Sequence, residues 1–257
     1  MHKYLSMWKD KLIKSCKQQS QTVNQSFINF IFPPFCPICE SELKHTERFI
    51  CEDCYSHIKT IESHFCRKCG APLEEKRKTC KYCKGITFHF SKVRALGTFS
   101  TPLIEMIHLL KYERKTLIGN RLGILLGNLF LSDPELLLTD MILPVPLHRT
   151  RIRERGYNQS TLLAKMVSSI SGKDLCLDAV VRTKATKSQS KLDHEERLIN
   201  LEDAFRVVLP EIIKNKTVVV VDDVLTTGTT LDEITKTLLN SGAQSVYGLI
   251  LARAISV

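Results

Sequence analysis

Long hydrophobic runs are missing from this 257-residue sequence. A membrane-spanning helix needs roughly 20 consecutive apolar residues, and no stretch approaches that length. The longest apolar stretch near the N-terminus, residues 27–32, is interrupted by Asn29 and lies too deep in the chain for a secretory signal. We therefore expect a protein that has no transmembrane segment and works in the cytoplasm.

Aromatic and acidic residues are also scarce. Aromatics make up 7% of the chain, and 27 acidic residues stand against 37 basic ones, for a formal net charge of +10. Residues 1–90 hold 15 Lys and Arg against 9 Asp and Glu, whereas the remainder holds 22 against 18. This excess favours a polyanionic partner, nucleic acid or anionic lipid, bound mostly by charge. Many soluble proteins are basic too, so charge alone identifies no partner.

Cysteine is abundant: eight of the ten residues form four CxxC pairs, separated by eleven, eleven and ten residues. The pairs are Cys36/Cys39, Cys51/Cys54, Cys66/Cys69 and Cys80/Cys83. Without an export signal, such close pairs are typical of metal ligands rather than disulfides. Two CxxC turns supply the four thiolates of a tetrahedral zinc ion, so the four turns predict two structural zinc sites.

The four turns allow two ways of sharing the zinc ions. Sequential pairing joins the first turn with the second and the third with the fourth, as in two stacked ribbons. Interleaved pairing gives a cross-brace. We favour sequential pairing, because each interval of ten or eleven residues suits one short hairpin.

The segment before the cysteines predicts a basic amphipathic helix. Leu5, Trp8 and Leu12 recur at helical spacing within residues 3–17, and lysines occupy other faces. Packing on a neighbouring domain explains such a helix better than binding to a membrane surface. We expect a helical lead-in over residues 1–32 and a double zinc ribbon over residues 33–90.

Residues 91–257 alternate between strand and helix patterns. The expected strands are 93–99, 141–145, 217–222 and 245–252, and the expected helices are 102–114, 117–131, 158–170 and 229–240. Asn158 is the expected N-cap of the third helix. Alternation of this kind predicts an α/β domain with a mostly parallel sheet and helices on its faces.

The most informative segment begins with four consecutive valines, residues 218–221. An all-apolar run of this kind predicts a central strand buried on both faces. Asp222 and Asp223 follow, and then a loop rich in threonine opens a helix. Ligands of parallel sheets bind at the carboxyl ends of strands, and a helix N-terminus suits a phosphate. Helix capping alone would explain Thr229 but not two adjacent acids after a buried strand.

Residues 218–230 resemble the phosphoribosyl pyrophosphate signature of type I phosphoribosyltransferases. Residues 144–148 and 155–159 are similar to the hallmark of the ComF family, specifically its ComFC-like members. The tripeptide at 110–112, the run 182–200 and the cysteine-rich front after the Phe-Pro-Pro at 32–34 also fit that family. The resemblance covers nearly the whole chain from about Phe27.

The resemblance implies a site for phosphoribosyl pyrophosphate, with Mg²⁺ bridging oxygens of the ligand. Asp222 and Asp223 would hold the ribose hydroxyls. The ribose phosphate would lie on a loop made of Thr226, Thr227, Gly228, Thr229 and Thr230. The pyrophosphate would lie near Leu147, His148 and Arg149. A mobile loop over residues 184–197 would close over the site.

Four arginines occupy alternate positions, at Arg149, Arg151, Arg153 and Arg155, with Glu154 as the one acid among them. Alternate positions do not share one face of a helix, so a solvated helix face does not explain the cluster. We expect a loop or an extended segment that faces an anion, which makes these arginines candidates for contact with nucleic acid.

Three functions compete at this point. ComF-like proteins are associated with DNA uptake in natural transformation, which implies a cytoplasmic protein that binds phosphoribosyl pyrophosphate and contacts single-stranded DNA. Its partners would include a DNA-uptake helicase or other competence proteins. The second function is an active transferase that moves phosphoribose to a base or amine. The third is a regulatory sensor of phosphoribosyl pyrophosphate. We favour the first, because the cysteine turns, the basic front and the arginines all suit nucleic acid.

Overall fold

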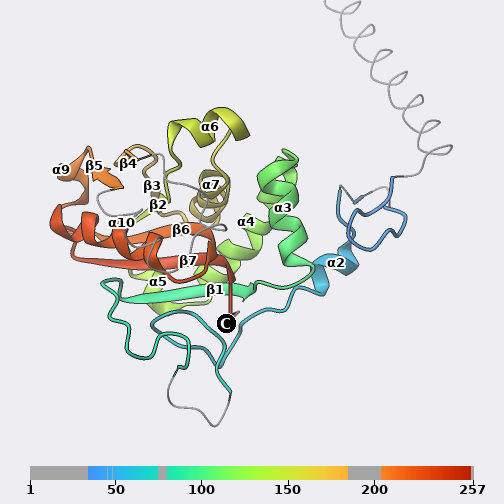
Figure 1. Ribbon diagram of the computed structural model, residues 1–257, viewed down its shortest axis with the longest axis horizontal. Helices are drawn as coiled ribbons and strands as arrows, with labels where there is room; N and C mark the ends of the chain where they lie inside the picture. Colours follow the sequence, from blue (N-terminus) through green and yellow to red (C-terminus); the bar gives the residue numbers. More distant parts are fainter. Residues whose placement is uncertain (1–33, 45, 48, 75–79, 185–203, 256–257) are drawn as a thin grey trace, which may run out of the picture. The chain divides into compact units, whose positions relative to one another are not determined.

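The computed structural model describes residues 34–44, 46–47, 49–74, 80–184 and 204–255 (Figure 1). The chain divides into two compact units, Met1–Ser56 and His57–Val257, and each is described by itself. The expected helix over residues 3–17 lies outside the described residues, as does the expected mobile loop beyond Lys184. Within the described ranges, none of the helices has the length and apolar character needed to cross a membrane.

The described part of the first unit consists of a short turn structure and one helix. Phe35 and Glu42 form an antiparallel bridge, and the first CxxC turn between them is closed by the Glu40 N–H, which donates to the Cys36 carbonyl at 2.8 Å. The second CxxC turn begins at Cys51 and continues into α2 (Glu52–Ser56). Each pair of cysteines therefore lies where the backbone reverses or starts a helix.

The second unit is built on a parallel five-stranded sheet in the order β1-β7-β6-β2-β3. A separate antiparallel pair, β4 and β5, follows. The strands are β1 (Lys92–Thr98), β2 (Met141–Pro144), β3 (Asp174–Leu175), β4 (Val180–Arg182), β5 (Phe205–Val207), β6 (Thr217–Leu225) and β7 (Ser245–Arg253). The expected α/β class with a mostly parallel sheet is confirmed.

Helices cover both faces of the sheet, as expected. They are α3 (Leu103–Tyr112), α4 (Thr116–Leu131), α5 (Pro134–Leu137), α6 (Arg149–Arg155), α7 (Gln159–Ser171), α9 (Pro210–Ile213) and α10 (Thr229–Asn240). On one side, Val218 and Val220 of β6 share a core with Ile234 and Leu238 of α10. Alternate strand residues point to the opposite side, where α4 and α7 contact the sheet. The valine run is thus fully buried, as its composition predicts.

Three glycines let α4 and α7 approach closely. Gly119, Gly123 and Gly127 are spaced four residues apart along one face of α4. A Cβ atom on Gly123 would lie 2.6 Å from Met166 Cβ, and one on Gly127 would lie 2.6 Å from Ile170 Cδ1. Larger side chains at these positions would push α7 away from α4. Since α7 begins beside the carboxyl end of β6, this packing helps to position the candidate site.

The third and fourth CxxC turns belong to the same unit as the sheet. Cys66 and Cys69 lie in one hydrophobic core with Val93 and Ala95 of β1. Phe65 and Pro72 form an antiparallel bridge around the third turn. The second cysteine cluster is therefore packed onto the parallel sheet.

The arginine-rich segment differs from the expected loop or extended chain, because it forms the helix α6. His148 caps the N-terminus, where its Nδ1 accepts from the Thr150 N–H at 3.3 Å. Gly156 ends the helix in the left-handed conformation (φ 87°), and its N–H donates to the Ile152 carbonyl. The expectation of a loop or an extended segment was wrong, because caps at both ends stabilise a helix here. The four arginines lie on different sides of it, in the i,i+4 pairs Arg149/Arg153 and Arg151/Arg155.

Candidate functional site: a phosphate-type loop and two zinc-type clusters

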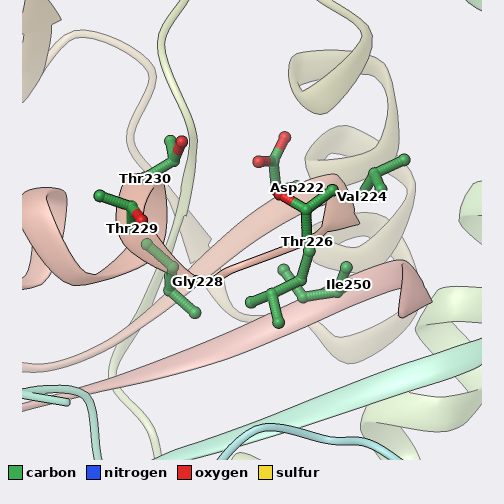
Figure 2. Close-up of a pocket in the computed structure, with 9 residues that line it drawn as sticks. Asp222, Val224, Thr226, Gly228, Thr229, Thr230 and Ile250 are labelled. Atoms are coloured by element: carbon green, nitrogen blue, oxygen red, sulfur yellow. The ribbon is translucent and has the colours of Figure 1, made fainter. Parts of the chain in front are cut away.

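The loop between β6 and α10 forms an open cavity at the carboxyl edge of the sheet. The open space at the loop, solvent included, is about 250 Å³, and Figure 2 shows the residues that line it. The lining residues are Asp222, Val224, Leu225, Thr226, Gly228, Thr229, Thr230, Leu231 and Ile250. The cavity therefore collects five predicted site residues at the N-terminus of a twelve-residue helix. Backbone N–H groups at such a helix end favour an anion.

Gly228 is required by both the backbone and the packing. It is the N-cap of α10 and adopts φ 90°, which residues with a Cβ atom rarely do. A Cβ atom there would also lie 3.0 Å from Phe88 Cε1. Thr227 lies on the same turn, where its Oγ1 accepts from the Thr229 N–H at 3.4 Å and is 2.8 Å from Thr229 Oγ1. The loop is thus a tight turn with two linked hydroxyls.

Asp222 and Asp223 lie within β6, so the strand runs further than the expected end at residue 222. Asp222 lines the cavity, and its Oδ1 accepts from Ser160 Oγ and from the Asp223 N–H, each at 2.9 Å. Asp223 points elsewhere: it is 4% exposed and pairs with Lys111 Nζ of α3 at 2.9 Å. Of the two adjacent acids, one faces the cavity and the other is held by a lysine.

Burial raises the pKa of Asp222 to about 7, and the neighbouring Asp223 carboxylate adds to that shift. Lys111, the Asp223 N–H and Ser160 oppose it. Arg182, at the end of β4, lies close enough that the Asp222 charge raises its pKa, although burial lowers it more. A carboxyl group in this setting ionises readily only when a cation or hydrogen-bond donors approach it.

This shift predicts a pH dependence of stability in the ligand-free protein. Because the pKa is raised above its ordinary value of 3.8, the folded state binds the proton between about pH 4 and pH 7 while the unfolded state has lost it. The free energy of unfolding should therefore fall as the pH rises through that window, by no more than about 1.4 kcal/mol per unit for one proton. Urea titrations at several pH values, with Asp222→Asn as the comparison, should show a flatter profile in the variant. Equal slopes in both proteins would contradict the assignment.

The segment with Leu147, His148 and Arg149 lies at the same edge of the sheet. β2 pairs with β6 in parallel, and the Val145 N–H just beyond β2 donates to the Val221 carbonyl at 2.9 Å. The residues after β2 therefore start beside Asp222. Leu147 and His148 are half-buried, whereas Arg149 is exposed in the first turn of α6.

Three residues of this site were not predicted as part of it: Lys111, Ser160 and Arg182. Ser160 lies two residues after Asn158. The Asn158 side chain accepts from the Ser160 N–H at 3.0 Å, so Asn158 is the N-cap of α7 as expected. Lys111 lies in the last turn of the apolar helix α3, and no local pattern distinguishes it from a solvent-exposed lysine. The family resemblance included the positions of Lys111 and Arg182 but assigned them no role.

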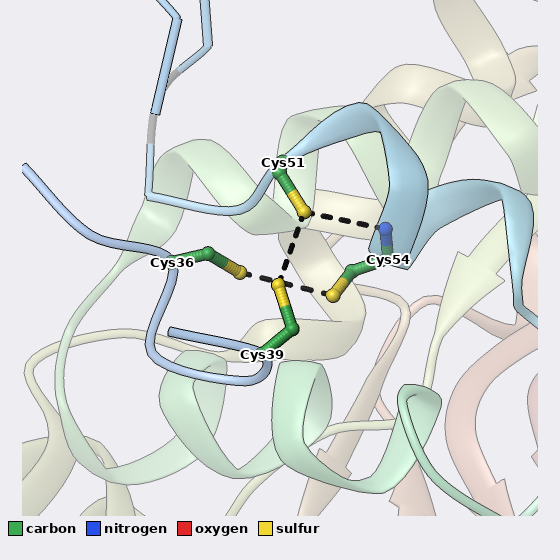
Figure 3. A group of neighbouring side chains, drawn as sticks. All are labelled: Cys36, Cys39, Cys51 and Cys54. Carbon is green, nitrogen blue, oxygen red and sulfur yellow. Dashed lines mark hydrogen bonds between the residues drawn. The ribbon is translucent and has the colours of Figure 1, made fainter. Parts of the chain in front are cut away.

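The first cysteine cluster matches the sulfur geometry of a tetrahedral zinc site. In Figure 3 the four side chains point toward one another, with Cys36 Sγ 3.8 Å from Cys54 Sγ and Cys39 Sγ 3.5 Å from Cys51 Sγ. Four sulfurs at about 2.3 Å from one zinc ion lie about 3.8 Å apart. A hydrogen bond with Ser41 lowers the pKa of Cys39 to about 6, which favours a thiolate there.

The second cluster has the same geometry. Cys66 Sγ lies 3.6 Å from Cys83 Sγ, and Cys69 Sγ lies 3.6 Å from Cys80 Sγ. Burial raises the pKa of Cys69 to about 11, so a cation must compensate the thiolate if this sulfur is to be a ligand. Within each cluster all four sulfurs lie within 4.8 Å of one another. The sequential pairing of the CxxC turns is confirmed, and both clusters fit structural zinc.

Two family models match parts of the chain. Residues 27–84 match the double zinc ribbon domain family, and residues 152–255 match the phosphoribosyl transferase domain family. Among solved structures, the allosteric regulatory enzyme of purine biosynthesis is 19% identical, with a TM-score of 0.37, over 52% of this chain and 26% of that chain.

Two of the curated relatives resemble the chain over most of its length, and a third over less than half of it. It is 35% identical to the DNA utilization protein YhgH of Escherichia coli over 191 residues, which cover 73% of this chain and 83% of the relative. It is 34% identical to Competence protein F of Haemophilus influenzae over 194 residues, covering 72% and 83%. Competence protein ComFC of Bacillus subtilis is 33% identical over 44% of this chain and 45% of the relative. The chain belongs to the ComF family.

Proposed function

We propose that the chain binds phosphoribosyl pyrophosphate with Mg²⁺ at the β6–α10 loop and serves DNA uptake or utilisation in the cytoplasm. The observation that carries the ligand assignment is the cavity in which Asp222 faces the threonine-rich N-terminus of α10. This arrangement offers a carboxylate to a ribose diol and N–H and hydroxyl donors to the attached phosphate. The role in DNA metabolism is carried over from the names of the relatives.

The residues around the cavity suit a magnesium ion that is held mainly by the ligand. Asp222 is the one carboxylate among the lining residues, so the protein supplies few hard oxygen ligands there. Mg²⁺ usually keeps several waters and binds through one or two carboxylates together with phosphate oxygens. When bound, the ion would neutralise pyrophosphate charge, while Asp222 orients the sugar. Arg182 and the segment 147–149 would face the pyrophosphate.

For single-stranded DNA we propose the exposed surface of α6 together with Tyr112. Arg149, Arg151 and Arg153 are exposed, whereas the Arg155 guanidinium lies 5.6 Å from the centre of the Tyr112 ring. Tyr112 is 63% exposed, so its ring can stack on a base. Arg151 is partly neutralised by Glu154 at 2.9 Å, which leaves Arg149 and Arg153 as the stronger phosphate contacts.

Salt dependence tests this nucleic-acid surface. Each neutralised phosphate of a single strand contributes about −0.7 to the slope of log affinity against log salt, so about four contacts give a slope near −3. Replacing Arg149 and Arg153 with Ala should make the slope shallower by about 1.4 without changing zinc content. Fluorescence anisotropy with a labelled oligonucleotide across a salt series measures this slope. The control is Lys173→Ala, which removes a positive charge on the turn after α7. Salt-independent affinity, or no binding at low salt, would remove the basis for DNA contact.

An active phosphoribosyltransferase is the second candidate. The exposed Tyr112 ring follows Lys111, which holds Asp223, so a planar acceptor could stack within reach of the sugar site. Incubation with phosphoribosyl pyrophosphate, Mg²⁺ and a panel of bases and amines decides between the two candidates. Release of pyrophosphate that depends on one acceptor would establish the transferase. Binding without release would favour the non-catalytic role.

A further inference from the structure

Arg253, the last residue of β7, links the second cysteine cluster to the β6–α10 loop. It is 4% exposed, and its Nε donates to the Cys69 carbonyl at 3.0 Å. Its Nη1 donates to the Leu225 carbonyl at 3.0 Å and to the Thr226 carbonyl at 2.6 Å. A guanidinium is a rigid planar fork, so the three carbonyls are held in a fixed relation to one another.

Cys69 contributes both the carbonyl that Arg253 contacts and one sulfur atom of the second cysteine cluster. Cys69 is 1% exposed, and its Sγ lies 3.6 Å from Cys80 Sγ within the second cluster. The next residue, Gly70, has φ 68°, and its N–H donates to the Cys66 carbonyl at 2.8 Å. A metal that fixes the sulfur of Cys69 therefore also fixes the carbonyl that Arg253 contacts.

A second connection runs from the same cluster through the chain after Cys83. Phe88 lies against Gly228 of the loop and stacks on Phe90, with ring centres 4.6 Å apart. Between them, the His89 N–H donates to Asp232 Oδ1 in the first turn of α10 at 2.6 Å, and His89 Nδ1 lies 3.0 Å from Oδ2. The segment 88–90 thus contacts both Gly228 and the start of the helix.

We infer that Arg253 is a positioning residue for the phosphate loop and that the second zinc site, unlike the first, is energetically coupled to ligand binding. The inference rests on the proposed function. Zinc at Cys69 would hold the carbonyl that anchors Arg253, and Arg253 would hold the backbone of Leu225 and Thr226 in the conformation that presents N–H groups to a phosphate. Coupling between two binding sites is reciprocal, so the ligand must in turn stabilise zinc at the second site.

The first test measures affinity for phosphoribosyl pyrophosphate with Mg²⁺ by calorimetry. Arg253→Lys keeps the charge but cannot span three carbonyls, so the dissociation constant should rise at least tenfold. Arg206→Lys, an exposed position on β5, is the matched control and should bind as the parent does. Zinc content and near-ultraviolet circular dichroism verify that each variant is folded. Unchanged affinity in a folded Arg253→Lys protein would overturn the inference.

The second test uses the unaltered protein and remains informative if Arg253→Lys does not fold. A chromogenic chelator follows the release of the two zinc ions with and without phosphoribosyl pyrophosphate and Mg²⁺. Ligand should slow the release of one ion and leave the other unchanged. Cys39→Ser and Cys80→Ser, one change in each cluster, identify which ion is protected.

The two failures are distinguishable. If the parent protein binds no phosphoribosyl pyrophosphate, the proposed function is wrong and the inference falls with it. If the parent binds but zinc release from the second site is unaffected by ligand, only the coupling is wrong. Protection of both ions alike would indicate general stabilisation and would also contradict the specific role of Arg253.

Discussion

Replacing Asp222 and Asp223 together with Asn should abolish the stabilisation that phosphoribosyl pyrophosphate and Mg²⁺ give to the protein. At a ligand concentration about a hundred times the dissociation constant, the parent protein should gain roughly 2.7 kcal/mol in free energy of unfolding. The double variant should gain nothing measurable. Asn at 222 lacks the negative carboxylate that would accept hydrogen bonds from the ribose hydroxyls in the proposed complex, and Asn at 223 removes the ion pair with Lys111.

The fold should survive this double change. Asn has nearly the shape of Asp, and its side-chain oxygen can still accept from Ser160 and from the backbone N–H of residue 223. Replacing both carboxylates, one half-buried and one buried, also removes their mutual repulsion. Thermal unfolding with and without ligand measures the effect, and Asp178→Asn at an exposed position is the control. A double variant that ligand stabilises as much as the parent would place the binding site elsewhere.

The single variants separate the two acids. Asp222→Asn should weaken binding directly, because this residue lines the cavity. Asp223→Asn should act through Lys111, whose ammonium would be left partly buried without its partner, so the ligand-free protein should also lose stability. A lower ligand-free stability in Asp223→Asn than in Asp222→Asn would therefore show that the two adjacent acids have different surroundings.

Removing zinc should have different consequences at the two clusters. Native mass spectrometry of the reduced protein should find two zinc ions, since each cluster of four sulfurs fits one. Structural zinc typically contributes about 10–16 kcal/mol of binding free energy, so each local fold should depend on its ion. Loss of the first ion should unfold the described part of Met1–Ser56 and leave His57–Val257 folded.

Loss of the second ion should lower the melting temperature of the sheet itself, because Cys66 and Cys69 pack in its core with Val93 and Ala95. Cys80→Ser and Cys39→Ser compare the two sites, and Cys176→Ser tests a cysteine outside both clusters. Hydrogen exchange of the β1 and β7 amides is the measurement. Equal protection of these strands in Cys80→Ser and Cys39→Ser would show that the second ribbon does not support the sheet.

Patterns within short segments were sufficient for much of the fold and for part of the site. The run 218–221 predicted a central strand because only a strand buried on both faces is apolar at every position. The expected helix over 229–240 has the same bounds as α10. The spacing of the cysteines predicted two clusters, because a CxxC turn presents both sulfurs locally and neighbouring turns need only a short hairpin to meet. In each of these cases the structure is determined by interactions between residues that are close in sequence.

The helix α6 shows where a local pattern misleads. The alternate arginines suggested an extended segment, but exposed arginines place no demand on backbone conformation. His148 and Gly156 at the two ends, with their capping hydrogen bonds, are what make the segment helical. A capping residue followed by glycine eight positions later was present in the sequence and was outweighed by the charge pattern.

Other parts of the site depended on tertiary structure alone. Ser160 reaches Asp222 across 62 residues of sequence, and Arg253 reaches the Cys69 carbonyl across 184. Neither contact leaves a periodic or compositional trace, because each depends on how a helix or ribbon packs against the sheet. The sequence by itself determined which residues carry charge, thiolate and hydroxyl groups and in which elements they lie. Adjacent residues of a strand point to opposite sides. Only the packed fold decided that the cavity lies on the side of Asp222 and Lys111 on the side of Asp223.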